Sequence, residues 1–126
     1  MLGEEPRAAY DRVQLSAFFS GRSAEDLGLV EERFFAQHAI GLQLGAHAVS
    51  LDRESRCVRT AAGEEYRYDA LVLATGARPR PLPVKGAESE GHVYLRSLRD
   101  ARVLKERMHA AASVIVSAGG TARHSP

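Results

Sequence analysis

A short apolar run in this chain ends on very small residues, and charge follows. Residues 71–80 read LVLATGARPR, so the run closes on Thr75 and Gly76, and Arg78 and Arg80 come next, separated by a proline. Small residues at the end of a buried strand leave room for a ligand to approach the backbone. The pattern predicts that a flat, charged cofactor lies against this end. Thr75 and Gly76 could also be turn residues alone, and the two arginines a solvated basic loop.

A second candidate for ligand chemistry is the glycine-rich stretch SAGGTA at residues 117–122. A phosphate-binding turn of the form G-x-G-x-x-G/A needs glycines for its tight turn and for close approach of the phosphate, and then a small residue for packing. Gly119 and Ala122 satisfy the second and third positions, whereas Ser117 occupies the first. Only RHSP follows, so we expect no helix that could direct its N-terminus at a phosphate. An ordinary glycine-rich tail is the alternative.

The residue types that most often act as nucleophiles or metal ligands indicate no such chemistry here. The single cysteine, Cys57, excludes an internal disulfide, a Cys-x-x-Cys redox pair and a cysteine-ligated cluster or zinc site within this chain. Because Cys57 lies in an alternating stretch, we interpret it as a small buried hydrophobe. Ser16 lacks the G-x-S-x-G context of a hydrolase. The histidines show no metal-ligand spacing, so no metal site is expected: His38, His47, His92, His109 and His124.

Three helices are expected to position these residues. The segment DRVQLSAFFSG predicts a short helix ended by Gly21, with Val13, Leu15, Phe18 and Phe19 facing inward. Ser23 and Asp26 resemble a capping box before a helix at about 30–39. The side chains at helical spacing there are Leu27, Val30, Phe34 and His38. Near the other end, Ser97 and Asp100 predict a capped helix. Its apolar stripe consists of Leu98, Ala101, Leu104, Met108 and Ala111.

Strands are expected between these helices. AVSLD, RCVRT and EYRYD, between residues 48 and 69, alternate apolar and polar positions and are separated by turn sequences. They predict a three-stranded antiparallel meander with Val49 in the core. Residues 71–76 do not alternate, which is typical of a strand covered on both faces in a parallel sheet. The run SVIV at 113–116 predicts a second buried strand.

Composition narrows the class of protein. The chain has 126 residues, 44% of them apolar and 26% charged, with a formal net charge of +1. These values are typical of one soluble globular domain and show no bias toward a polyanion, so no nucleic-acid partner is expected. No apolar stretch approaches the roughly 20 residues that span a bilayer, and the first residues lack the features of a signal peptide. We therefore expect a cytoplasmic protein without a membrane partner.

Taken together, these segments resemble a known family. EPRAAYDRVQLS and YDALVLATGARP, with GLVEERFFAQHAI and VYLRSLRDARVLKERM, are similar to the flavin domain of the FAD-dependent pyridine nucleotide oxidoreductases. The likeness covers nearly all of residues 3–118. It is greatest to the N-terminal flavin-binding part of the large subunit of assimilatory NAD(P)H nitrite reductases, and rubredoxin and ferredoxin reductases share the same plan. It implies an α/β fold, a partial FAD/NAD(P)-binding Rossmann-like domain with the meander and flanking helices.

The resemblance implies roles at the first part of the chain. In the family, an acidic residue holds the adenosine ribose of FAD, and Glu5 stands at the matching position. A carboxylate suits that task because it can accept two hydroxyl hydrogen bonds. Arg12 matches an arginine that lies along the flavin and pyrophosphate. Ferredoxin reductases carry a lysine where this chain has Ala17, so the resemblance implies no flavin contact from a lysine at this position. Glu5 could instead be a solvated acid and Arg12 a surface arginine.

Further positions are implied at the meander and beyond it. Val49 matches a residue whose backbone holds the adenine. Thr75 and Gly76 match the small strand end at which the backbone approaches FAD, and Arg78 would lie near the cofactor. No catalytic residue and no metal ligand are implied.

The expected organisation is that of a fragment. Residues 1–112 would form an incomplete FAD-binding domain without its first strand and glycine-rich turn, and residues 113–126 the start of a truncated NAD(P)-binding fold. The resemblance implies an enzyme that passes hydride from NAD(P)H to FAD and electrons onward, with the isolated piece inactive. Its partners would be FAD and either other domains or subunits of a nitrite reductase or a redox partner protein. The alternatives are a fragment of a rubredoxin or ferredoxin reductase and a non-catalytic interaction module that retains part of the fold.

Overall fold

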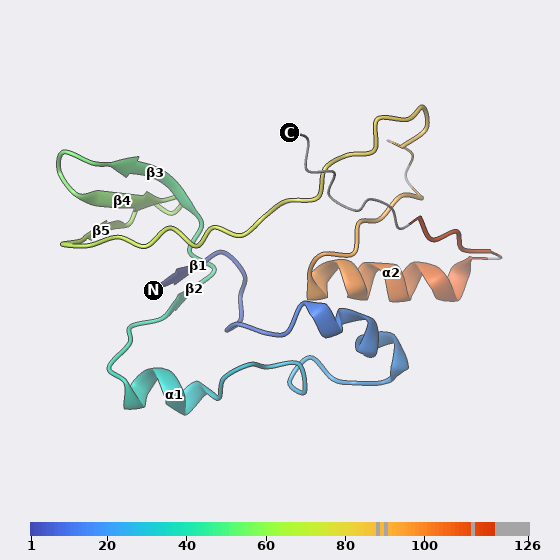
Figure 1. Cartoon of the computed structure of the whole chain (residues 1–126), viewed down its shortest axis with the longest axis horizontal. Coiled ribbons are helices and arrows are strands. Elements are labelled where there is room, and N and C mark those ends of the chain that lie inside the picture. The colour runs from blue at the N-terminus through green and yellow to red at the C-terminus, as the bar shows by residue number, and fades with distance from the viewer. Residues whose placement is uncertain (88, 90, 112, 118–126) are drawn as a thin grey trace, which may run out of the picture.

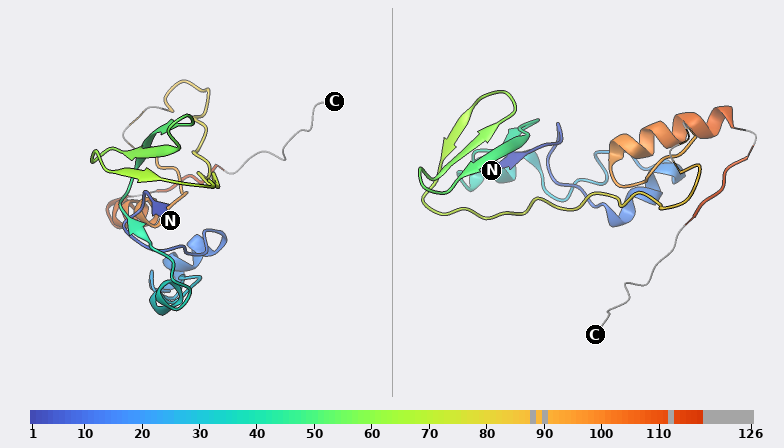
Figure 2. Two further views of the ribbon diagram at one scale, coloured as in Figure 1. Left: turned by 90° about the vertical axis from the view of Figure 1, so that its left-hand side faces the viewer. Right: turned by 90° about the horizontal axis from the view of Figure 1, so that it is seen from above.

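The computed structural model of the chain describes residues 1–87, 89, 91–111 and 113–117. Its elements are, in chain order, β1 (Leu2–Gly3), the 3-10 helix η1 (Val13–Ser20), α1 (Glu32–Gln37), β2 (Gln43–Leu44), β3 (Ala48–Asp52), β4 (Cys57–Thr60), β5 (Glu65–Arg67) and α2 (Leu98–Ala110). The three-stranded sheet and the η1–α2 pair lie at opposite ends of the molecule, with β1 and β2 between them (Figures 1 and 2). The mixed α/β class expected from the sequence is confirmed.

The core lies where η1 packs against the first turn of α2. Leu98 and Ala101 of α2 are 1% and 0% exposed, and Phe18 and Phe19 cover the same cluster from η1. The other buried members of the cluster are Tyr10, Leu15, Ala24 and Leu27. Burying a side chain the size of leucine stabilises the fold by about 1.5–3 kcal/mol, so this small cluster holds one end of the molecule together.

Helix η1 ends where the sequence predicts, but it is a 3-10 helix. Gly21 stops it in the left-handed conformation, with φ at 96°. Three residues per turn place Leu15 and Phe18 on one face. Val13 does not share that face and is 91% exposed, so its expected inward position is wrong.

The expected helix at 30–39 forms as the shorter α1. Ser23 and Asp26 make both hydrogen bonds of a capping box, at 3.1 and 2.9 Å, but they close a turn rather than begin this helix. Phe35 of α1 is buried, whereas the expected Phe34 is exposed and stacks on the exposed His38 ring at 4.2 Å. The spacing of apolar residues predicted the position of the helix correctly. Its buried face carries Phe35, the residue after the expected Phe34.

Helix α2 forms as expected. The Ser97 hydroxyl accepts from the Asp100 amide at 3.2 Å, and the Asp100 carboxylate accepts from the Ser97 amide at 2.8 Å, which completes a capping box. The stripe is buried only in its first turn, because Met108 and Ala111 are exposed. No helix among the described residues combines the length and the apolar character that a bilayer crossing needs.

The meander is antiparallel in the order β3-β4-β5, with Leu51 opposite Val58 and Val58 opposite Tyr66. Val58 and Thr60 are its buried side chains. The Thr60 hydroxyl accepts from the Glu64 amide at 3.2 Å, so the buried oxygen is satisfied at the turn. Val49 is 54% exposed, so its expected place in the core is wrong.

The two expected buried strands do not form. Residues 71–76 belong to no strand, and Figure 1 shows them running from β5 toward the loop before α2. Val72 is 88% exposed, and Val114, Ile115 and Val116 at the second expected strand are also exposed. A parallel strand needs neighbours on both sides and layers on both faces. The described residues supply only one parallel pair, β1 with β2, so neither run is paired or covered.

Candidate functional site

The segment that carries Glu5 is fixed by the short parallel pair. Leu2 lies opposite Gln43 and Gly3 opposite Leu44, and the amide of Gly45 donates to the Glu5 carbonyl at 3.1 Å. A second backbone bond, from the amide of Ala46 to the carbonyl of Gly3, is 2.9 Å long. These bonds fix the backbone of the short segment after β1 that carries Glu5.

Glu5 and Arg12 are brought together by a tyrosine. The Glu5 carboxylate forms an ion pair with the Arg12 guanidinium through Oε1, and its Oε2 accepts from the Tyr10 hydroxyl at 2.7 Å. Nη1 of Arg12 donates to the same hydroxyl at 3.0 Å, and its guanidinium carbon lies 4.7 Å from the centre of the Tyr10 ring. We call Glu5, Tyr10 and Arg12 the acid-tyrosine-arginine cluster. The cluster joins Glu5 and Arg12, which the resemblance assigned separately as contacts of the cofactor.

The cluster also contacts the start of α2. The amide of Leu98, the first residue of the helix, donates to the Tyr10 hydroxyl at 3.1 Å. The first amides of a helix have no partner within the helix, so an oxygen from outside must satisfy them. Tyr10 does this for Leu98, and Ser97 does it for Asp100. The cluster is thereby attached to the buried core.

Burial and charge act together on the cluster. Tyr10 is 6% exposed, and burial, followed by its hydrogen bond to Glu5, raises the pKa of the phenol above 10.0. Burial tends to lower the pKa of the Arg12 guanidinium, but its hydrogen bond to Glu5 and the neighbouring acidic groups outweigh that effect, so the pKa is raised. The cluster therefore holds a neutral phenol and a charged guanidinium at neutral pH. The side chains of Glu5 and Arg12 remain 31% and 40% exposed, so both can still reach a ligand.

A chain of hydrogen bonds connects the cluster to the segment that follows the apolar run. Nη1 of Arg12 donates to the Arg96 carbonyl at 3.2 Å, and Nε of Arg96 donates to the Ala77 carbonyl at 3.4 Å. Ala77 lies between Gly76 and Arg78. The structure therefore links the predicted cofactor segment to the cluster through Arg96.

Thr75, Gly76 and Arg78 themselves are exposed, and no hydrogen bond within the described residues joins them to Glu5 or Arg12. Gly76 has φ at 70°, a left-handed conformation that glycine adopts without strain. A β-carbon built on Gly76 would meet no atom within 4 Å. No group therefore lies close enough to the Gly76 backbone to exclude a side chain. Glycine is favoured at this position only by the left-handed backbone conformation.

Val49 lies in the meander, apart from the cluster. The start of its strand is connected to the β1 end by the His47 imidazole, whose Nδ1 lies 3.2 Å from Glu4 Oε1. Ala46, two residues before β3, bonds to Gly3. The predicted site residues therefore fall into three places: the cluster, the exposed 75–78 segment linked to it, and the meander.

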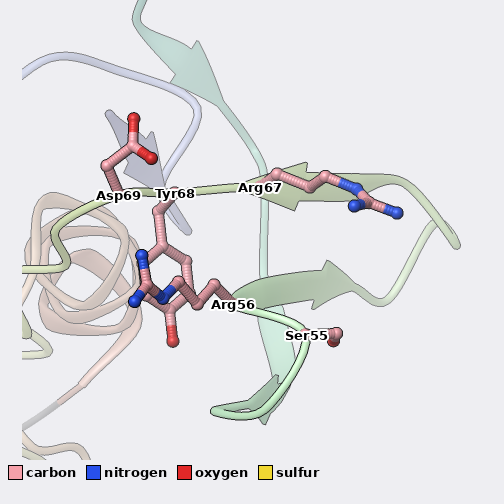
Figure 3. Close-up of a pocket in the computed structure, with 5 residues that line it drawn as sticks. All are labelled: Ser55, Arg56, Arg67, Tyr68 and Asp69. Carbon is pink, nitrogen blue, oxygen red and sulfur yellow. The ribbon is translucent and has the colours of Figure 1, made fainter.

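Two hollows lie on the meander, and no predicted site residue lines either of them. One of about 280 Å³ is lined by Ser55, Arg56, Arg67, Tyr68 and Asp69. In the view of Figure 3 the Arg56 side chain overlaps the Tyr68 ring, and the Arg67 side chain extends in a different direction. The two guanidinium groups do not converge, so this hollow lacks the geometry of an anion site. A second, of about 320 Å³, lies on the same sheet around Cys57 and Arg59.

No group of three or more histidine, cysteine or acidic side chains converges among the described residues. Cys57 is free and only half-buried, which is less burial than its alternating stretch predicts. The glycine-rich stretch SAGGTA from Ala118 onward lies outside the described residues.

Sequence reasoning missed two residues of the site. Tyr10 lies in the segment EPRAAYDRVQLS, between the two residues assigned to the cofactor, and it is the residue that joins them. Its place two residues before Arg12, within the segment assigned to the cofactor, was the available signal. Arg96 had no signal, because its contact with Ala77 spans 19 positions.

The comparisons with known proteins agree on one family. The chain belongs to the pyridine nucleotide-disulphide oxidoreductases, whose family description matches residues 1–123. This is a family of FAD-binding enzymes with NAD(P)H-dependent members, as the resemblance implied.

Among curated relatives, the chain is 49% identical over 117 residues to the nitrite reductase [NAD(P)H] large subunit of Klebsiella oxytoca, which covers 93% of this chain and 12% of that protein. It is 39% identical over 122 residues to the rubredoxin-NAD(+) reductase of Pseudomonas putida, covering 95% of this chain and 32% of that protein. Among solved structures, the ferredoxin reductase for the CYP199A2 system of Rhodopseudomonas palustris superposes with a TM-score of 0.77 at 38% identity, over 86% of this chain and 27% of that one. The chain therefore spans about a third or less of each of these relatives.

Proposed function

We propose that this chain is part of the FAD-binding domain of an NAD(P)H-dependent oxidoreductase of nitrite-reductase type, and that the acid-tyrosine-arginine cluster is the part of its cofactor site that these residues build. The observation that carries the proposal is the contact between Glu5 and Arg12. Two residues assigned to one cofactor from the sequence lie in a single half-exposed ion pair.

The hydrogen-bonding groups of the cluster suit the adenosine end of FAD. Each carboxylate oxygen of Glu5 has one partner, and each can accept a second hydrogen bond. Two free acceptor positions on one carboxylate match the two hydroxyls of a ribose. The half-exposed guanidinium beside them is suited to offset the charge of a pyrophosphate. When bound, FAD supplies the two-electron chemistry, and this chain's residues hold its nucleotide end.

The remaining assignments are part of the same proposal. Thr75, Gly76 and Arg78 would contact the cofactor through the segment that Arg96 connects to the cluster, and the Val49 backbone would hold the adenine. Residues 1–112 would be the incomplete FAD-binding domain and residues 113–126 the beginning of an NAD(P)-binding fold. Other domains of a nitrite reductase, or a separate redox protein, would complete the site and accept the electrons.

The nitrite-reductase type is favoured by its identity of 49%, compared with 39% for the rubredoxin reductase. A second candidate, a rubredoxin or ferredoxin reductase type, is favoured by the superposition with a ferredoxin reductase. The two differ in what lies downstream. A cysteine-rich, siroheme-type region in the neighbouring coding sequence supports the first type, and its absence there supports the second.

FAD binding itself is tested by titration of the purified chain. We expect added FAD to lose fluorescence as it binds, with an affinity weaker than that of a complete flavoprotein, since the phosphate-binding turn contributes several charge-assisted hydrogen bonds there. A chain that does not change FAD fluorescence at any protein concentration up to its solubility limit would contradict the proposal.

A further inference from the structure

We propose that Tyr10 is a positioning residue for the cofactor site, one that sets the direction of the Glu5 carboxylate and contacts no ligand itself. The inference rests on the proposed function, because it concerns how Glu5 meets the ribose. It adds a residue and a role that the comparisons do not assign.

The hydrogen-bond directions at Tyr10 are determined by its partners. The Arg12 guanidinium and the Leu98 amide have hydrogens to donate and no lone pair to accept with, so both must donate to the Tyr10 oxygen, at 3.0 and 3.1 Å. The single phenol proton is then left for Glu5 Oε2, 2.7 Å away. A hydroxyl with one donated and two accepted bonds has no capacity left for a ligand.

The position of the hydroxyl is also determined. The Tyr10 ring is buried in the core cluster beside Leu98 and Ala101, and the backbone of its segment bonds to that of Leu27 and Leu29. The oxygen is therefore held between the α2 start and β1. Because Oε2 of Glu5 is bonded to this oxygen and Oε1 to Arg12, the carboxylate cannot rotate without breaking one of the two bonds. Its remaining lone pairs keep one orientation, which reduces the entropy lost when a diol binds.

The test compares Tyr10→Phe with the wild-type chain in titrations with FAD and with FMN, which lacks the adenosine. Phenylalanine keeps the ring and removes only the hydroxyl. Loss of a hydrogen bond to a charged group predicts FAD binding weaker by roughly 10-fold, with FMN affinity unchanged within about twofold. Tyr66→Phe is the matched control, because the Tyr66 hydroxyl also donates to a glutamate, Glu64 at 3.1 Å, on the distant meander. It should leave both affinities unchanged.

A double-mutant cycle with Glu5→Ala separates positioning from general loss of structure. If Tyr10 acts through Glu5, Tyr10→Phe weakens FAD binding in the wild-type background and has little further effect once Glu5 is alanine. Equal effects in both backgrounds, or equal losses for FAD and FMN, would overturn the inference.

Two outcomes distinguish this inference from the proposed function. If the wild-type chain binds no FAD, the proposed function fails, and the role of Tyr10 toward the ribose fails with it. If the wild-type chain binds FAD and Tyr10→Phe binds it equally well, only the inference is overturned. Should Tyr10→Phe not fold, a ring-fluorinated tyrosine at position 10 replaces it. Its more acidic phenol should lose the donated proton at a lower pH, so FAD affinity should fall at a lower pH than in the wild-type chain, and an identical pH profile would overturn the inference.

Discussion

At the scale of single residues, Arg12 combines four modest interactions on one guanidinium. It pairs with Glu5, donates to the Tyr10 hydroxyl and the Arg96 carbonyl, and lies over the Tyr10 ring. An ion pair this exposed contributes about 0–1 kcal/mol, and a cation over an aromatic ring adds about 0.5–1 kcal/mol. Its larger role in this account is therefore to hold Glu5 and to present charge to a cofactor.

Arg12→Ala is expected to lower the free energy of unfolding by about 1 kcal/mol, because the lost ion pair is half-exposed and the buried Tyr10 hydroxyl keeps its bonds to Glu5 and Leu98. Urea denaturation followed by far-UV circular dichroism measures the change. Arg59→Ala is the matched control. Arg59 pairs with Glu65 but is more exposed and touches no ring, so its loss should be smaller. A larger loss at Arg59 than at Arg12 would contradict this description of the cluster.

The Tyr10 phenol leads to a prediction of how the stability of the chain depends on pH. Burial and the Glu5 hydrogen bond raise its pKa above 10.0, so the folded chain prefers the neutral phenol more than the unfolded chain does. The stabilisation is complete below pH 10.0 and is lost as the pH rises through the folded pKa. Urea unfolding measured at several values between about pH 8 and 11 should show a steeper fall for the wild-type chain than for Tyr10→Phe. Parallel curves would show that the phenol is not held neutral by the fold.

At the scale of elements, α2 is buried at its start and exposed at its end. Its first turn carries the capping box, the Tyr10 contact and both fully buried residues, whereas Met108 and the residues around it are exposed. Stability of the helix and geometry of the site thus depend on the same turn.

Ser97→Ala is expected to destabilise the chain by about 1 kcal/mol, because it leaves the Asp100 amide without its cap. Thermal denaturation followed by circular dichroism at 222 nm measures it. Ser16→Ala is the control, since Ser16 is exposed and its hydroxyl makes no hydrogen bond with the described residues. Similar midpoints for Ser97→Ala and the wild-type chain would contradict the assignment of the cap.

Elements with local signals could be predicted from the sequence, and those that depend on distant partners could not. The capping box of α2, the stop at Gly21 and the meander depend on residues a few positions apart. Residues 71–76 have the composition of a buried strand, but a strand exists only beside its neighbours. The acid-tyrosine-arginine cluster could be predicted only in part. Glu5 and Arg12 could be found by resemblance, whereas their contact through Tyr10 depends on the Leu98 amide, 88 positions from Tyr10.

At the scale of the whole molecule, two apolar runs of strand-like composition remain uncovered. Leu71, Val72 and Leu73 form one, and Val114, Ile115 and Val116 the other. Exposed runs of this kind, with unpaired backbone groups, favour association between chains.

Val72→Asp is expected to reduce self-association without lowering the midpoint of thermal unfolding, because Val72 is 88% exposed and contributes little to the core. Sedimentation velocity over a range of concentrations measures the association. Val13→Asp serves as the control, since Val13 is equally exposed but lies outside both runs. If both variants associate as the wild-type chain does, the uncovered runs are not the contact surface.

The central claim, that the Glu5 carboxylate receives the ribose of FAD, is tested most directly by comparing FAD dissociation constants of the wild-type chain and Glu5→Gln. Glutamine has the same shape, but one oxygen becomes an amide that donates, so we predict binding weaker by about 10-fold or more. Glu64→Gln, which alters a carboxylate bonded to a tyrosine on the meander, should bind FAD as the wild-type chain does. Equal FAD affinity for Glu5→Gln and the wild-type chain would contradict the account.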